Sequence, residues 1–166
     1  MPGFGCVTDE QRTSRIAFSG QLKSRTQEVS GQLKTKPDQS KNKEFVADSM
    51  AMCALIAAAD GSIDANERQE RAALIMSNDV LGIFDPAELK TKFEFYCDKL
   101  SGDYDFGKVA AIGTIGKLRS KSDQARAVIQ IGIIIGGSDG NVDADEKKAV
   151  KEACLAVGIP PADFDL

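Results

Sequence analysis

Asp60-Gly61-Ser62-Ile63-Asp64-Ala65-Asn66-Glu67 is the stretch that decides the fold, and Asp139-Gly140-Asn141-Val142-Asp143-Ala144-Asp145-Glu146 is a second version of it. Five of the eight positions are identical between the two stretches. An apolar run precedes each stretch, and a charged, helix-favouring segment follows each one. Because self-similarity of this kind marks a repeated supersecondary unit, the sequence predicts two helix–acidic turn–helix units related by a pseudo-twofold axis.

The rest of the chain after residue 40 has the apolar spacing of helices. A helix predicted over 42–59 has an inner face traced by Phe45, Met52, Leu55, Ile56 and Ala59, with Val46 and Cys53 beside it. Further helices are predicted over 65–76, 86–100, 104–119, 124–137 and 144–157, and Pro160-Pro161 begin a last short turn. No segment alternates convincingly as a strand would, so the predicted fold class is all-α.

Three of these helices carry specific expectations about burial. The helix over 86–100 turns its apolar residues inward, namely Leu89, Phe93, Tyr96, Cys97 and Leu100. The helix over 104–119 holds Phe106, Val109, Ile112, Ile115 and Leu118. The segment 124–137 is apolar nearly all round, which predicts the most buried helix of the domain, although its β-branched run is also compatible with a strand.

Length and charge divide the chain into a basic front and an acidic body. A chain of 166 residues corresponds to about one domain. Residues 1–43 contain eight basic and four acidic side chains, whereas the whole chain has a net charge of −4, which argues against a nucleic-acid binder. We predict a partly flexible segment over 1–40 with a weak amphipathic helix, and a helical domain over 41–166. That helix is expected to be solvated or loosely docked, and peripheral membrane contact is the alternative.

The residue types disfavour enzymatic activity. Histidine is absent, which removes the commonest general base and a common metal ligand. The four cysteines lack zinc-like spacing, and Cys53 and Cys154 are predicted to be buried free thiols. No apolar leader-like or membrane-spanning run is visible, so we expect a cytoplasmic protein that can associate with the inner face of the membrane.

Each acidic turn matches the second part of a calcium-binding loop of the EF-hand type. An acidic residue, a glycine, an apolar residue and a closing glutamate follow in the same order. The first ligand positions of such a loop fall on Ile56 and Ala58, and on Ile135 and Gly137, which supply no side-chain oxygen. Because Ca²⁺ prefers six to eight oxygen ligands, one turn alone is expected to bind it weakly, and the two turns together offer a shared site. The candidate ligands are Asp60, Asp64, Glu67, Asp139, Asp143 and Glu146.

The same residues also have a purely structural interpretation. Asp64 followed by Glu67 has the spacing of a helix N-cap and its capping-box partner. However, Asp60 and Asp139 each follow a helix C-terminus, where the macrodipole disfavours negative charge. A cation is therefore expected near them, either a metal or a basic side chain such as Arg68, Arg71, Lys147 or Lys148.

At these residues the sequence resembles the TerB family of tellurite resistance proteins. The resemblance is close from residue 41 to about 76 and from about 125 to 166, and looser between them. It is carried by Asn42-Lys43-Glu44-Phe45-Val46, Ala57-Ala58-Ala59-Asp60-Gly61, Asp103-Tyr104-Asp105-Phe106, Ser138-Asp139-Gly140-Asn141, Asp145-Glu146-Lys147 and Pro161-Ala162-Asp163-Phe164.

The resemblance implies a domain of about seven helices with internal pseudo-twofold symmetry, and a role in resistance to tellurite. It also implies a complex with other Ter proteins, some at the inner membrane, and divalent-cation binding at the six acidic residues named above. The same domain type occurs in a membrane-anchored co-chaperone, so a metal-independent protein-binding scaffold is the alternative. Direct reduction of tellurite would need a reactive cysteine pair or a redox cofactor, and only Cys6 is a candidate exposed thiol.

Overall fold

The computed structural model describes residues 39–136 and 142–166, and within these ranges the secondary structure consists of helices joined by short turns, with no strand. This confirms the all-α prediction. The described residues form six α-helices and three short 3-10 helices. In chain order they are α2 (Gln39–Ala57), α3 (Ala65–Ser77), η1 (Leu81–Ile83), α4 (Pro86–Gly102), α5 (Tyr104–Gly116), η2 (Lys117–Ser120), α6 (Ser122–Gly136), α7 (Ala144–Val157) and η3 (Pro161–Phe164).

Local sequence signals account for the ends of several helices. Asp85 caps α4 by accepting a hydrogen bond from Ala87 N, and Pro86 occupies the first helical position. Asp103 caps α5 through Phe106 N. Gly158 ends α7 in the left-handed conformation, with φ of 73°, which a glycine adopts without steric cost.

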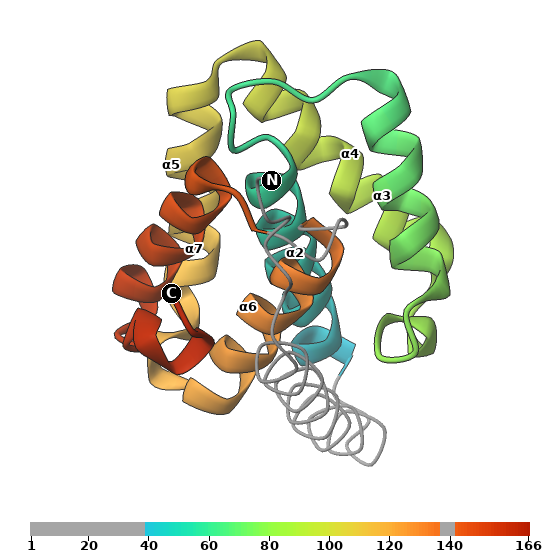
Figure 1. Cartoon of the computed structure of the whole chain (residues 1–166). Coiled ribbons are helices and arrows are strands. Elements are labelled where there is room, and N and C mark those ends of the chain that lie inside the picture. Colours follow the sequence, from blue (N-terminus) through green and yellow to red (C-terminus); the bar gives the residue numbers. More distant parts are fainter. Residues whose placement is uncertain (1–38, 137–141) are drawn as a thin grey trace, which may run out of the picture.

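Helix α2 lies at the centre of the domain, and α4, α5, α6 and α7 all pack against it (Figure 1). Between residues 45 and 56 nearly all of its side chains are buried, with Phe45, Met52 and Leu55 each at 0% exposure. A helix that is apolar all round belongs in the core. The sequence predicted that the segment 124–137 would be the most buried helix, and this is wrong. Ile134 on α6 is 42% exposed, because α6 covers α2 from one side.

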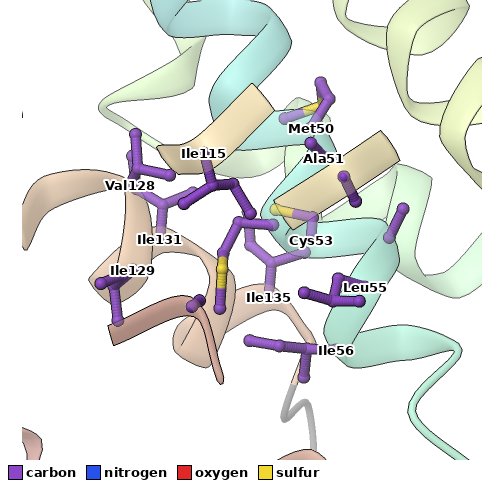
Figure 2. Close-up of a cluster of buried hydrophobic side chains, with 14 of the residues drawn as sticks. Met50, Ala51, Cys53, Leu55, Ile56, Ile115, Val128, Ile129, Ile131 and Ile135 are labelled. Carbon is purple, nitrogen blue, oxygen red and sulfur yellow. The ribbon is translucent and has the colours of Figure 1, made fainter. Parts of the chain in front are cut away.

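The most extensive contact in the domain is between α2 and α6. Figure 2 shows side chains of both helices meeting in the core, together with Ile115 of α5. Gly132 allows this close crossing, since a Cβ atom there would overlap the side chain of Met52. The helix interpretation of the β-branched run in α6 is therefore correct.

Helix α5 presents a different face to the core than its apolar residues suggested. The predicted helix holds Phe106 and Val109, but Phe106 is 66% exposed and Val109 is 71% exposed, so neither lies in the core. Instead Gly107, Ala111 and Ile115 form the buried face. The face of α5 that carries the small residues Gly107 and Ala111 lies inward, because the start of α5 touches the backbone at the end of α4.

Helix α4 turns its predicted apolar face to the core. All five residues predicted to point inward from α4 are buried. No helix in the described part of the chain is long and apolar enough to cross a membrane. The turn before α7 includes 137–141, which lie outside the described residues. The pseudo-twofold relation between the halves therefore stays a prediction.

Candidate functional site

The first acidic turn connects α2 to α3, and its backbone geometry explains most of its residues. Gly61 has φ of 97°, a conformation that other L-residues rarely adopt, and its N–H donates to Ala58 O at 2.9 Å. The carboxylate of Asp60 accepts a hydrogen bond from Ser62 N at 3.1 Å. Ile63 is buried and anchors the turn to the core. Asp60 itself is exposed, just beyond the end of α2.

Asp64 and Glu67 form a complete capping box at the start of α3. Asp64 Oδ1 accepts from Glu67 N at 2.8 Å, and Glu67 Oε2 accepts from Asp64 N at 2.9 Å. This reciprocal arrangement satisfies two backbone donors that a helix start leaves without partners. The structural interpretation of these two residues is therefore correct.

The second acidic turn repeats this capping arrangement at the start of α7. Asp143 Oδ1 accepts from Glu146 N at 2.8 Å, and Glu146 Oε2 accepts from Asp143 N at 3.0 Å. The N-cap residues Asp64 and Asp143 also share nearly the same backbone conformation. Asp139, the remaining candidate ligand, lies outside the described residues.

Neither Arg68 nor Arg71, the basic residues expected near the first turn, pairs with its carboxylates in the described structure. Arg68 Nη1 lies 2.6 Å from Asp98 Oδ1 on α4, and Arg68 also donates to Ser101. Nε and Nη1 of Arg71 are buried without a hydrogen-bond partner in the described structure. Within residues 39–136 and 142–166, no ion pair joins Asp60, Asp64 or Glu67 to a lysine or arginine.

The described carboxylates do not converge into a ready-made metal site. No three acidic or cysteine side chains within the described ranges lie close enough together to hold a metal ion. Asp60, Asp64 and Glu67 each use one oxygen in a local backbone hydrogen bond. An ionised carboxylate accepts about four hydrogen bonds or ligand contacts in total, so capping leaves capacity for a cation. The turn alone therefore offers a weak site at most.

Sequence reasoning missed one buried acid, Asp48 in α2. Its residue exposure is 5%, and buried apolar residues such as Phe45 and Met52 lie beside it on α2. Burial, and then repulsion from Glu44, raises the pKa of Asp48 to about 7, although Lys117 and Lys121 act in the opposite direction. The available signal was a charged residue inside the apolar run of α2.

The three cysteines in the described part of the chain are buried free thiols. This confirms the expectation for Cys53 and Cys154. Burial raises the pKa of Cys97 to about 12 and that of Cys154 to about 11, and raises the pKa of Cys53 as well. Because the thiolate is the reactive form, these groups are poor nucleophiles and poor metal ligands.

Comparisons with known proteins agree with the resemblance described above. The family model for tellurite resistance protein TerB matches residues 47–166, from within α2 to the end of the chain. A protein of Alcaligenes sp. described as a tellurium resistance protein TerB is 26% identical over 119 residues, which covers 72% of this chain and 98% of that protein. No solved structure gives a significant match.

Proposed function

This chain belongs to the TerB family of tellurite resistance proteins, and from that premise we propose that it serves the tellurite-stress response as a non-enzymatic adaptor. It joins a complex with other Ter proteins, including one at the inner membrane. Its acidic turns bind a divalent cation weakly, and Ca²⁺ is the expected ion. The absence of histidine from the chain and the burial of three thiols support the non-enzymatic part of the proposal.

The observation that carries the cation proposal is the uncompensated charge of the first acidic turn. Asp60, Asp64 and Glu67 lie within one turn of chain, and no basic side chain of the described residues pairs with them. Like charges at this spacing repel each other, and Asp60 also follows the negative end of a helix dipole. A bound divalent cation relieves both unfavourable interactions.

The second acidic turn adds the ligands that the first turn lacks. A Ca²⁺ ion prefers six to eight oxygens, and three carboxylates with backbone carbonyls do not reach that number reliably. Asp139, Asp143 and Glu146 repeat the same residue types in the same order. We propose either a pair of weak sites or one shared site, with a dissociation constant at the weak end of the range for calcium-binding proteins, on the order of 10⁻⁴–10⁻³ M.

Calorimetric titration of the metal-free full-length protein with Ca²⁺, and then with Mg²⁺, tests the cation proposal. The test variant carries Asp60→Asn and Asp139→Asn, which remove two charges and keep one side-chain oxygen at each position. The matched control carries Asp85→Asn and Asp103→Asn, which change two N-cap aspartates elsewhere. Saturable Ca²⁺ heat in the wild type and control, lost in the test variant, is the expected result.

A metal-independent scaffold is the second candidate, and the two complete capping boxes favour it. Asp64, Glu67, Asp143 and Glu146 already have a structural role that requires no metal. In this case the acidic surface binds a basic partner protein without a metal, and the chain acts as a co-chaperone-like scaffold. The absence of heat at millimolar Ca²⁺, with all variants folded normally, would rule out the cation-responsive adaptor and leave this scaffold.

A further inference from the structure

Helices α4 and α5 share an exposed apolar face that the proposed cation site does not use. We define this aromatic–lysine face by Lys92, Phe95, Lys99, Phe106 and Val109. Phe95 is 48% exposed, Phe106 is 66% exposed and Val109 is 71% exposed. Isolated exposed apolar residues are ordinary, but several of them together mark an interaction site.

Contacts of the lysines show that these residues form one continuous surface. Lys99 Nζ lies 4.9 Å from the centroid of the Phe95 ring and 5.8 Å from that of the Phe106 ring, so it bridges the two helices. Lys92 Nζ lies 5.9 Å from the Phe95 centroid on its other side along α4. Val109 is three residues after Phe106 and so lies on the same side of α5. The face thus combines exposed apolar area with two positive charges.

The backbone beneath this face is held firmly. Only Asp103 separates α4 from α5 (Figure 1). The hydroxyls of Tyr96 and Thr114 are 3.0 Å apart, which links the two helices farther along. The ring of Phe95 packs edge-on against Tyr96, with centroids 5.2 Å apart. A surface fixed in this way loses little conformational entropy when it binds, which favours recognition.

We propose that the aromatic–lysine face docks an acidic amphipathic helix of a partner protein. The partner's apolar side chains lie on Phe95, Phe106 and Val109, and its Asp or Glu side chains pair with Lys92 and Lys99. Charge complementarity favours this occupant, because Lys92 and Lys99 place two positive charges beside the rings of a body whose overall balance is acidic. Apolar residues at Phe106 and Val109, one turn apart along α5, match the spacing by which a helix docks. The inference rests on the proposed adaptor function and names the chemistry of its partner.

Other occupants fit the face less well. A second copy of the chain meeting it symmetrically would place its own Lys92 and Lys99 against the same lysines. Residues 1–43 carry eight basic and four acidic side chains, so this segment brings the wrong charge. A flat anionic membrane would meet the exposed carboxylates of Asp103 and Asp105 beside Phe106, whereas a narrow helix need not.

Nitrogen–proton NMR spectra of the full chain, recorded in EDTA, test the proposal with defined probes. The first probe is a synthetic amphipathic helix with leucines on one face and glutamates on the other. The second probe is the same peptide with lysines in place of the glutamates. The glutamate peptide is expected to shift resonances of α4 and α5 saturably, and to bind at least about tenfold more tightly than the lysine peptide, equivalent to about 1.4 kcal/mol.

Paired variants separate the charge from the apolar surface. Lys92→Glu with Lys99→Glu is expected to reverse the preference to the lysine peptide. The matched control, Lys147→Glu with Lys148→Glu, changes two exposed lysines of α7 and is expected to keep the glutamate preference. Phe106→Ser is expected to weaken binding of both peptides at least about fivefold, whereas Leu155→Ser, at a residue 71% exposed on α7, leaves it unchanged.

Four outcomes would overturn the proposal. The first is that millimolar glutamate peptide shifts no resonance of α4 or α5, and the second is that both peptides bind equally well. The third is that these resonances shift with protein concentration when no peptide is present. The fourth is that phosphatidylserine vesicles selectively broaden these resonances while peptide has no effect. The third outcome indicates self-association and the fourth indicates a membrane surface. Because EDTA removes divalent cations, failure here leaves the Ca²⁺ calorimetry unaffected, and failure of the calorimetry leaves these shifts unaffected.

Discussion

Asp48 is an acidic residue whose buried surroundings oppose its charge. The side chain belongs to the central helix α2 and is almost completely buried. Glu44 precedes it by one helical turn and repels it, while Lys117 and Lys121 attract it from the segment before α6. Desolvation is the largest of these effects, and it favours the protonated carboxyl group in the folded protein.

The first prediction at the residue scale is that Asp48 makes the protein less stable as the pH rises. Its pKa is about 7 when folded and about 3.8 when unfolded, so between these values only the folded state holds the proton. Stability therefore falls as pH increases from about 4 to 7 and stays lower above that. Asp48→Asn removes this loss, with a gain of about 2–4 kcal/mol at pH 8 that disappears near pH 4. Urea unfolding at pH 4.5, 6 and 8 measures the difference between the two proteins.

A second variant makes the interpretation of Asp48 specific. Glu44→Gln removes the nearby negative charge and should lower the pKa of Asp48 in the folded protein. The decline of stability with rising pH should then end at a lower pH in this variant than in the wild type. A stability difference between Asp48→Asn and wild type that is constant from pH 4.5 to 8 would contradict the assignment. The comparison between variants cancels contributions from the exposed carboxylates, which both proteins share.

The corner between α4 and α5 decides how these two elements meet. A Cβ atom at Gly107 would lie 2.7 Å from Leu100 N, from Leu100 Cα and from the carbonyl carbon of Lys99. These are backbone atoms at the end of α4, so they cannot move aside as a flexible side chain can. Gly113, two turns farther along α5, has nothing within 4 Å of such an atom.

The two glycines of α5 should therefore respond oppositely to the same substitution. Gly107→Ala is expected to destabilise the protein by about 1–3 kcal/mol, because the corner must open to admit the methyl group. Gly113→Ala is expected to stabilise it by about 0.5–1 kcal/mol, because alanine is the better helix former at an open position. Chemical denaturation of both variants measures this. If both substitutions changed the free energy of unfolding by a similar amount, close packing at Gly107 would not be what limits the approach of α4 and α5.

At the scale of elements, the sequence predicted what depends on neighbouring residues in the chain. The N-cap of α3 was predicted from the spacing of Asp64 and Glu67 and is confirmed. The proline start of α4 and the glycine end of α7 likewise depend only on interactions within a few residues. The exposure of Phe106 could not be predicted, because α5 has apolar residues on two sides and Gly107 determines which side faces α4.

The candidate site shows the same boundary between local and long-range interactions. The capping roles of Asp64 and Glu67 could be predicted from their spacing. The contact of Arg68 with Asp98 could not, since it depends on how α3 packs against α4, 30 positions apart in sequence. The raised pKa of Asp48 likewise depends on burial by the packed fold, which Lys117 and Lys121 offset only in part.

At the scale of the whole molecule, the packing of α2 joins the two halves of the proposed repeat. Although α2 belongs to the first half, its most extensive contact is with α6 of the second half, and it also contacts α5 and α7. Removing α2 would expose the core face of each of these helices. The halves should therefore unfold together as a single cooperative unit, even if they arose by duplication.

Three buried thiols distributed along the chain provide a measurement of this cooperativity. Cys53 lies in α2, Cys97 in α4 and Cys154 in α7. With Cys6 replaced by serine, labelling by a thiol reagent in low urea reports the opening free energy at each position, after correction for rates in the unfolded protein. Because α2 packs on both halves, the three free energies should agree within about 0.5 kcal/mol and equal that of global unfolding. A markedly lower value at Cys154 alone would mean that α7 opens while the first half remains folded, and the halves would then be separable units.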